Sequence, residues 1–320
     1  MTVVRAIAHP NIAVIKYWGK RDVPLNLPAV PSLSLTLDGF ETDTRVRWGL
    51  NQDADRIVIN GEQLGGSAAA RVSRFLDLVQ PERPRCEVVS TNNFPTAAGL
   101  ASSSSAFAAL ALAATTAAGV SLSPEALSVL ARRGSGSACR SLWGGWVHWQ
   151  MGQAADGHDC HGIPLAPQDH WDLRLVVVFI AKGPKPIGST AGMIRTQTTC
   201  PLYAGWVSSA PADVDAGRAA VLGRDLPGLG AAMERSTLKM HATMIATEPT
   251  IRYWRPTTLA AIETIEDLRQ RGTDCWYTMD AGPNVKVLTT PEGAVQVAAA
   301  MAAAGLETRT LGVGGDAHLC

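Results

Sequence analysis

Residues 92–105 read Asn-Asn-Phe-Pro-Thr-Ala-Ala-Gly-Leu-Ala-Ser-Ser-Ser-Ser, a stretch rich in small residues. An apolar run with β-branched residues (86–89) precedes them and an Ala- and Leu-rich segment (106–118) follows, so the order predicts strand, turn and helix. Small residues let backbone N–H groups approach a ligand, and a helix N-terminus is partly positive. The stretch favours phosphate binding, with serine hydroxyls for phosphate or metal. A Ser-capped core helix after a tight turn is the alternative.

The overall composition limits the class of protein. The sequence has 28 Lys plus Arg and 28 Asp plus Glu, so no global field attracts nucleic acid or an anionic membrane, and any anion must be bound locally. The six cysteines form no CxxC pair, which indicates reduced thiols in a cytosolic protein. Neither a charged-then-apolar leader nor an apolar run long enough to span a membrane is evident. We therefore expect a soluble, cytoplasmic protein.

The chain of 320 residues is long for a single hydrophobic core and predicts either one large domain or two closely packed lobes. A polar segment rich in Gly, His and Asp, at about residues 152–172, suggests a junction between lobes 1–172 and 173–320. Strands are predicted at 3–8, 32–37, 42–48, 56–59, 173–180, 275–279, 285–288 and 307–313; helices at 66–79, 106–118, 124–132, 226–246, 256–271 and 291–304; and small-residue loops at 134–141 and 188–193.

Two lysines lie four residues apart in the segment 11–22. The whole chain has only six lysines against 22 arginines, so Lys16 and Lys20 stand out from the background. Lysine is a compact cationic donor that suits phosphate oxygens. The alternative is the solvated end of a strand.

Arg140 follows a second small, hydroxyl-rich loop and precedes the aromatic run 142–149. A solvated side chain would be out of place there, and a guanidinium in such surroundings usually pairs with a carboxylate or a phosphate. The partner could be a ligand or an internal Asp or Glu.

Asp280 lies where an apolar strand breaks into Ala-Gly-Pro-Asn. An aspartate at a strand end can simply cap its own turn. A carboxylate on a rigid strand end can also serve as a general base. Lys16 could orient Asp280 and hold it ionised if the fold brings the two together.

Four blocks of sequence resemble mevalonate diphosphate decarboxylases of the GHMP kinase superfamily, and the similarity runs across essentially the whole chain. The blocks are Asn11-Ile12-Ala13 with Lys16-Tyr17-Trp18-Gly19-Lys20-Arg21, then residues 95–103, then 134–141, and finally Asp280-Ala281-Gly282-Pro283-Asn284. The first and third blocks are highly specific, whereas the Gly-Leu-Ala-Ser-Ser block alone indicates only an ATP-binding protein of the superfamily.

The resemblance implies a fold and an activity. The fold is an α+β GHMP-kinase-type structure, with a ribosomal-protein-S5-like N-terminal lobe, a ferredoxin-like C-terminal lobe and a deep cleft between them. Such enzymes bind ATP and Mg²⁺ with (R)-5-diphosphomevalonate and phosphorylate its 3-hydroxyl. They then release phosphate and CO₂ to give isopentenyl diphosphate, as part of isoprenoid biosynthesis. The family is commonly dimeric, so the resemblance also implies a homodimer.

Roles carried over by position follow the motifs. Asp280 would be the base or orienting carboxylate at the 3-hydroxyl, Arg140 would hold the substrate carboxylate, and Lys16 would lie near the reacting phosphoryl group. The other expected substrate contacts are Tyr17, Lys20, Ser135, Ser137 and Thr190. The expected nucleotide contacts are Asn92, Ala98, Gly99, Leu100, Ala101, Ser102 and Ser103, with Ser103 also near the metal.

Other readings of the same scaffold stay open at this stage. Gly188-Ser189-Thr190 differs from the Ser-Ser-Thr often found in this block. A phosphomevalonate decarboxylase, or a mevalonate-type kinase that stops at the phosphate ester, would share most of the motifs. A non-enzymatic nucleotide-binding protein would be expected to lack Asp280, Arg140 or Lys16, and all three are present.

Overall fold

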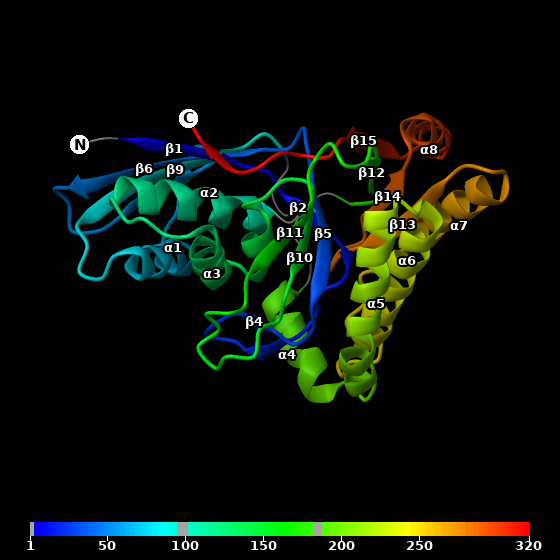
Figure 1. Cartoon of the computed structure of the whole chain (residues 1–320), viewed down its shortest axis with the longest axis horizontal. Coiled ribbons are helices and arrows are strands. Elements are labelled where there is room, and N and C mark those ends of the chain that lie inside the picture. The colour runs from blue at the N-terminus through cyan, green and yellow to red at the C-terminus, as the bar shows by residue number, and fades with distance from the viewer. Residues whose placement is uncertain (1–2, 95–101, 182, 184–186) are drawn as a thin grey trace.

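The computed structural model describes residues 3–94, 102–181, 183 and 187–320. In this part of the chain, three larger β-sheets and a small ribbon combine with helices in two lobes (Figure 1). The predicted α+β class is confirmed.

The N-terminal lobe contains a six-stranded sheet in the order β16-β1-β6-β9-β7-β8. Helix α2 packs against β1 and β6 and touches α1 and α3 on its other side, so Ala residues on all its faces are buried (Figure 1). The C-terminal strand returns to this sheet beside β1, which ties the end of the chain to its beginning. The elements are β1 (Val4–Ala8), β6 (Thr42–Leu50), β7 (Arg56–Ile59), β8 (Glu62–Gln63), β9 (Arg85–Asn92), β16 (His318–Leu319), α1 (Gly66–Val79), α2 (Ser102–Ala117) and α3 (Pro124–Gly134).

A second sheet, in the order β11-β10-β5-β2, lies between the N-terminal helices and the helices of the other lobe (Figure 1). Helix α5 contacts β2, β5 and β11, and α6 contacts β2. The strands are β2 (Asn11–Ile15), β5 (Ser32–Thr36), β10 (Trp146–Trp149) and β11 (Gly162–Ala166); the short 3₁₀ helix η1 (Gly136–Arg140) precedes β10, and β3 (Lys20–Asp22) with β4 (Leu27–Pro28) forms the ribbon.

The C-terminal lobe is built on an antiparallel sheet in the order β13-β14-β12-β15. Helices α6 and α7 pack against β13, while α8 packs against β12 and β15. The elements are β12 (Arg174–Phe179), β13 (Cys275–Met279), β14 (Val285–Thr289), β15 (Glu307–Leu311), α4 (Ser189–Thr199), α5 (Tyr203–Gly223), α6 (Leu226–Ile245), α7 (Pro256–Gln270) and α8 (Pro291–Ala303).

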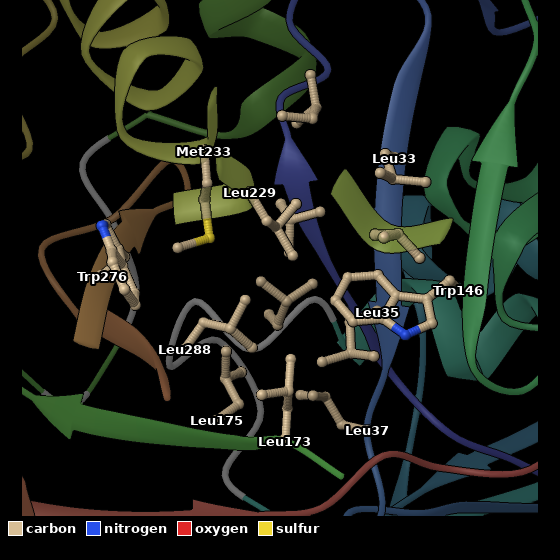
Figure 2. Close-up of a cluster of buried hydrophobic side chains, with 14 of the residues drawn as sticks. Leu33, Leu35, Leu37, Trp146, Leu173, Leu175, Leu229, Met233, Trp276 and Leu288 are labelled. Carbon is tan, nitrogen blue, oxygen red and sulfur yellow. The ribbon is translucent and has the colours of Figure 1, made fainter. Parts of the chain in front are cut away.

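One hydrophobic cluster joins the two lobes. Figure 2 shows Leu33, Leu35 and Trp146 of the middle sheet facing side chains of the C-terminal lobe, and all belong to one buried cluster. The opposing side chains include Leu175, Leu229, Met233, Trp276 and Leu288. Full burial of each large apolar side chain contributes about 1.5–3 kcal/mol. The two lobes therefore share one hydrophobic core.

Two predicted small-residue loops turn out to contain helix. The prediction of a turn at residues 188–193 is wrong, because α4 begins at Ser189. Its small residues serve packing instead: a Cβ on Gly192 would lie 3.0 Å from the Trp18 indole. The loop predicted at 134–141 contains η1, and a Cβ on Gly136 would lie 2.9 Å from Trp149 and 3.1 Å from the Tyr17 hydroxyl. Close approach explains the glycine at both sites.

None of the helices in the described ranges is both long and apolar enough to cross a membrane.

Candidate active site

A cavity of about 540 Å³ lies where the two lobes meet, and most of the predicted site residues line it. Its walls come from the ends of β2 and β13, from η1, and from the first turns of α2 and α4. The predicted residues that line it are Lys16, Tyr17, Lys20, Ser102, Ser103, Ser135, Ser137, Arg140, Thr190 and Asp280. Residues far apart in the sequence are therefore brought to one site.

Asp280 is held between two lysines just beyond the end of β13. Lys16 Nζ lies 2.8 Å from Oδ1, and Lys286 Nζ lies 3.1 Å from Oδ2. Both lysine side chains are about 1% exposed, whereas that of Asp280 is 27% exposed and opens onto the cavity. The backbone N–H of Lys16 donates to Ser236 Oγ (2.9 Å), which fixes the end of β2 against α6.

The two lysines decide the ionisation of this carboxylate. Burial alone would raise the pKa of Asp280, but the charges and hydrogen bonds of Lys16 and Lys286 outweigh it and hold the pKa below its ordinary value. Burial lowers the pKa of Lys16 to about 8, although Asp280 opposes the shift. At neutral pH the pair is ionised. A carboxylate with a lowered pKa is a weak base. Asp280 is therefore better suited to orient a hydroxyl group than to act as a strong base.

Arg140 is buried and supported by neutral groups. Its Nε and Nη2 donate to Asn11 Oδ1 (3.1 and 3.0 Å), and Nη1 donates to Ser32 Oγ (2.8 Å). Its guanidinium also lies 5.4 Å from the centre of the Trp149 ring. A guanidinium has five N–H donors, so these contacts leave one donor on each Nη without a partner among the described residues. Within those residues Arg140 has no ion pair, and it can still bind a carboxylate through both Nη atoms.

Lys20 is aimed at the cavity by a polar scaffold. Its Nζ donates to Asn26 Oδ1 (2.5 Å) and to Thr190 Oγ1 (3.4 Å). The Asn26 amide nitrogen donates to the carbonyls of Arg132 and Arg133, at 3.0 Å each, which leaves its oxygen to face Lys20. The end of α3 thus fixes the position of a cation on the cavity wall.

Hydroxyl groups line the side of the cavity next to α2. Ser103 Oγ and Ser135 Oγ lie 3.2 Å apart, so the start of α2 and the segment before η1 are in contact. The Tyr17 hydroxyl is buried and has no hydrogen-bond partner in the described part of the chain, while its ring packs edge-on against Trp149. Such a hydroxyl is suited to meet a polar group of a ligand.

Part of the predicted nucleotide site lies elsewhere. Asn92 is at the end of β9, does not line this cavity, and accepts a hydrogen bond from Thr42 Oγ1 (2.6 Å). Residues 98–101, predicted as nucleotide contacts, lie outside the described residues.

The oxygen atoms on the cavity wall are suited to a magnesium ion that is held mainly by a bound phosphate compound. No group of three or more His, Cys, Asp or Glu that could hold a metal occurs in the described ranges. Mg²⁺ prefers oxygen donors and commonly takes one or two from the protein and the rest from phosphates and water. The Ser102 and Ser103 hydroxyls and the Asp280 carboxylate supply such oxygens.

Three residues that support the site were not predicted from the sequence to belong to it. Lys286 contacts Asp280, while Asn11 and Ser32 hold Arg140. A lysine inside the apolar strand sequence Val-Lys-Val-Leu-Thr was a usable signal, because the chain has only six lysines. Ser32 gave no signal beyond the alternation of its strand.

Comparison with known proteins identifies the class and then the family. The two-lobed α+β fold matches solved structures of the GHMP-like class along nearly the whole chain. One family model, the diphosphomevalonate decarboxylase-like N-terminal domain, matches residues 8–162. A second, the mevalonate 5-diphosphate decarboxylase C-terminal domain, matches residues 175–310. The chain belongs to the diphosphomevalonate decarboxylase family.

Individual relatives are similar to this protein in sequence and structure along nearly the whole chain. The human diphosphomevalonate decarboxylase is 38% identical over 94% of this chain and 80% of its own length. The structure of mevalonate diphosphate decarboxylase from Staphylococcus aureus superposes with a TM-score of 0.94 at 34% identity, covering 99% of this chain and 98% of that one. A structure of MDDEF in complex with MVAPP, AMPPCP and magnesium matches with a TM-score of 0.92 at 37% identity, with the same coverage.

Proposed function

We propose that this protein catalyses the ATP-dependent decarboxylation of (R)-5-diphosphomevalonate to isopentenyl diphosphate, with release of ADP, phosphate and CO₂. The observation that carries the proposal is that Asp280, Lys16 and Arg140 line one cavity. A carboxylate for a hydroxyl, an ammonium for a phosphoryl group and a guanidinium for a carboxylate are the groups that this substrate requires.

In the first step, Asp280 orients the 3-hydroxyl toward the γ-phosphoryl group of ATP. The hydroxyl donates to a carboxylate oxygen, and its proton passes to that oxygen as the new O–P bond forms and the bond from the γ-phosphorus to the bridging oxygen breaks, which releases ADP. Because phosphoryl transfer has a loose transition state, little proton abstraction is needed early, and a weak but well-positioned base is sufficient. Lys16, 2.8 Å from Asp280, lies where it can neutralise charge on the transferred group.

In the second step, the phosphorylated tertiary oxygen leaves as phosphate, and positive character develops at C3. The C–C bond to the carboxylate breaks, CO₂ departs, and the electron pair of that bond forms the new double bond. Arg140 would hold the carboxylate through the donors left on its two Nη atoms and so fix the geometry for elimination. Lys20 and Tyr17 would contact the substrate, with Lys20 near its diphosphate, and Ser135, Ser137 and Thr190 would add hydroxyl contacts.

The nucleotide would lie along the start of α2. Ser102 and Ser103 line the cavity there, so their hydroxyls and the positive N-terminal end of the helix would face the phosphates. We assign Asn92 and residues 98–101 to the same nucleotide on the resemblance alone. Bound to the ATP phosphates, Mg²⁺ would supply charge neutralisation, with Ser103 as its proposed protein contact.

The test is the ratio of products. Purified protein supplied with ATP, Mg²⁺ and mevalonate 5-diphosphate should release CO₂ and ADP in equal amounts. ADP without CO₂ would indicate a kinase that stops at the phosphate ester, and would contradict the proposal. A parallel reaction with mevalonate 5-phosphate checks the choice of substrate: we expect a much lower kcat/KM, because this substrate lacks the second phosphate that Lys20 would contact.

We also propose that the protein is a homodimer. The support is the family resemblance, and the measurement is light scattering after size exclusion. A mass of twice a single chain is expected, and the mass of one chain would contradict the assignment.

A further inference from the structure

Lys286 reaches the active-site carboxylate from inside the C-terminal lobe. Strands β13 and β14 form an antiparallel pair in which Lys286 lies directly opposite Thr278. Side chains two residues apart on a strand share a face, so Asp280 follows Thr278 on the face that Lys286 occupies. A long side chain spans this diagonal, and Lys286 Nζ lies 3.1 Å from Asp280 Oδ2.

The two lysines that contact Asp280 differ in their access to the cavity. Lys16 binds Oδ1 and lines the cavity, whereas Lys286 binds Oδ2 and is absent from the cavity wall. Lys286 is also fully buried in β14. A ligand can therefore compete for Lys16 directly, while the contact between Lys286 and Asp280 is shielded from it.

The charged groups around Asp280 make this difference consequential. Besides the two lysines, Arg140 of η1 lines the same cavity as Asp280, and both Arg140 and His241 of α6 interact with it electrostatically. Burial first, and then the charge of Lys16, lower the pKa of His241 to about 3, so this imidazole is neutral at working pH. If Lys16 turns toward a phosphoryl group and Arg140 toward a carboxylate, Lys286 is the one cation in contact with Asp280 that remains in the described part of the chain. A buried carboxylate without a partner would take up a proton.

We propose that Lys286 is a positioning residue that anchors Asp280 through Oδ2 and keeps it an anion while Lys16 serves the phosphoryl group. This inference rests on the proposed function. It divides the work of the two lysines: Lys286 acts on the reaction through Asp280, while Lys16 acts on the substrate as well. Lys286 should therefore influence turnover more than substrate binding.

The experiment compares Lys286→Met, Lys286→Arg and the control Lys239→Met, which removes a lysine paired with Asp213 away from the cavity. We expect Lys286→Met to lower kcat about 10-fold or more, as loss of a group that supports a catalytic residue does at metal sites. Its KM for both substrates should stay nearly unchanged, and Lys286→Arg should recover part of kcat. The control should keep the wild-type values.

The pH profile separates positioning from a merely structural role. Lys286 repels the Lys16 ammonium, so its removal should move the alkaline limb of kcat to higher pH. If the Met variant does not fold, Lys286→Gln, which keeps a hydrogen-bond donor without the charge, replaces it. An unchanged kcat, or a loss with the alkaline limb in its wild-type place, would overturn the inference. A wild-type enzyme without CO₂ release would instead overturn the proposed function.

Discussion

Two buried ionic groups in this molecule have opposite designs. In the N-terminal lobe, Arg83 binds Asp55 through both Nη atoms, at 2.8 and 2.6 Å, and both side chains are at most 2% exposed. Asp55 also accepts the backbone N–H of Cys86 (3.0 Å). Asp77 Oδ1 also lies 3.1 Å from Arg83 Nε, so carboxylates of the protein itself balance this cation. This pair joins the start of β7 to the segment between α1 and β9.

The cavity between the lobes is not balanced in this way. Its charged lining in the described residues consists of Lys16, Lys20, Arg71 and Arg140 against Asp280, and Lys286 adds a further cation behind it. Excess buried cations destabilise a ligand-free protein, since each ion loses its hydration. The contrast indicates that a balanced ion pair stabilises the fold, whereas a cluster with excess positive charge is suited to bind a negatively charged ligand.

The largest expected effect is the loss of Asp280, the carboxylate of this cluster. Asp280→Asn should lower kcat about 10²–10⁴-fold, because an amide can neither orient the hydroxyl as an anion nor accept its proton. ATP binding should remain, as measured by calorimetric titration. Asp274→Asn, an exposed aspartate on the same segment, is the matched control. Near-normal turnover in a folded Asp280→Asn variant would remove Asp280 from its role.

The balanced pair should respond in stability rather than in turnover. Arg83→Met leaves Asp55 buried without its partner, and breaking a buried ion pair typically lowers the free energy of unfolding by about 3–5 kcal/mol. Chemical denaturation measures this loss. The kcat of the folded variant should equal that of the wild type. A large fall in kcat without a loss of stability would contradict the assignment of this ion pair to the fold.

A smaller effect is expected where the charge stays and the shape changes. Arg140→Lys keeps a cation but loses the planar fork, and a hydrogen bond to a charged group is worth about 1.5–3 kcal/mol. This corresponds to about a ten- to hundredfold fall in kcat/KM for the mevalonate substrate, with KM for ATP little changed. Steady-state kinetics with each substrate varied in turn would detect it. A lysine variant as efficient as the wild type would argue against bidentate binding.

The smallest effect is a pH dependence. Lys16 has a pKa of about 8, so it carries a proton below that pH and loses it above. Turnover should therefore fall as the pH rises through about 8, because the phosphoryl group loses its ammonium. Lys16→Met should show low turnover without this alkaline limb. A limb that persists in that variant would assign the titration to another group.

Much of the site could be predicted because its parts lie in short motifs. Lys16, Arg140 and Asp280 each stand out locally, as a lysine in a lysine-poor chain, an arginine before an aromatic run and a carboxylate at a strand end. The alternation of strands and the helical spacing likewise predicted most elements of the fold, including the long helices after residue 200.

The remainder depended on register and packing, which local patterns do not contain. Lys286 meets Asp280 only because β13 and β14 pair with Thr278 opposite Lys286. The helix α4 looked like a turn because Gly192 is needed for contact with Trp18 rather than for a bend. Asn11 supports Arg140 across a separation of 129 residues.

The most direct test is the thermal midpoint of Lys16→Met without substrate, measured at neutral pH beside Arg83→Met. The pKa of Lys16 is lower in the folded chain than in the unfolded one, so its protonated form destabilises the fold below that pKa, and the penalty disappears as the pH rises through the unfolded value. Asp280 keeps Lys286 as a partner in the variant. The account predicts that Lys16→Met retains or raises the midpoint while turnover is lost. A midpoint that falls as far as that of Arg83→Met would contradict it.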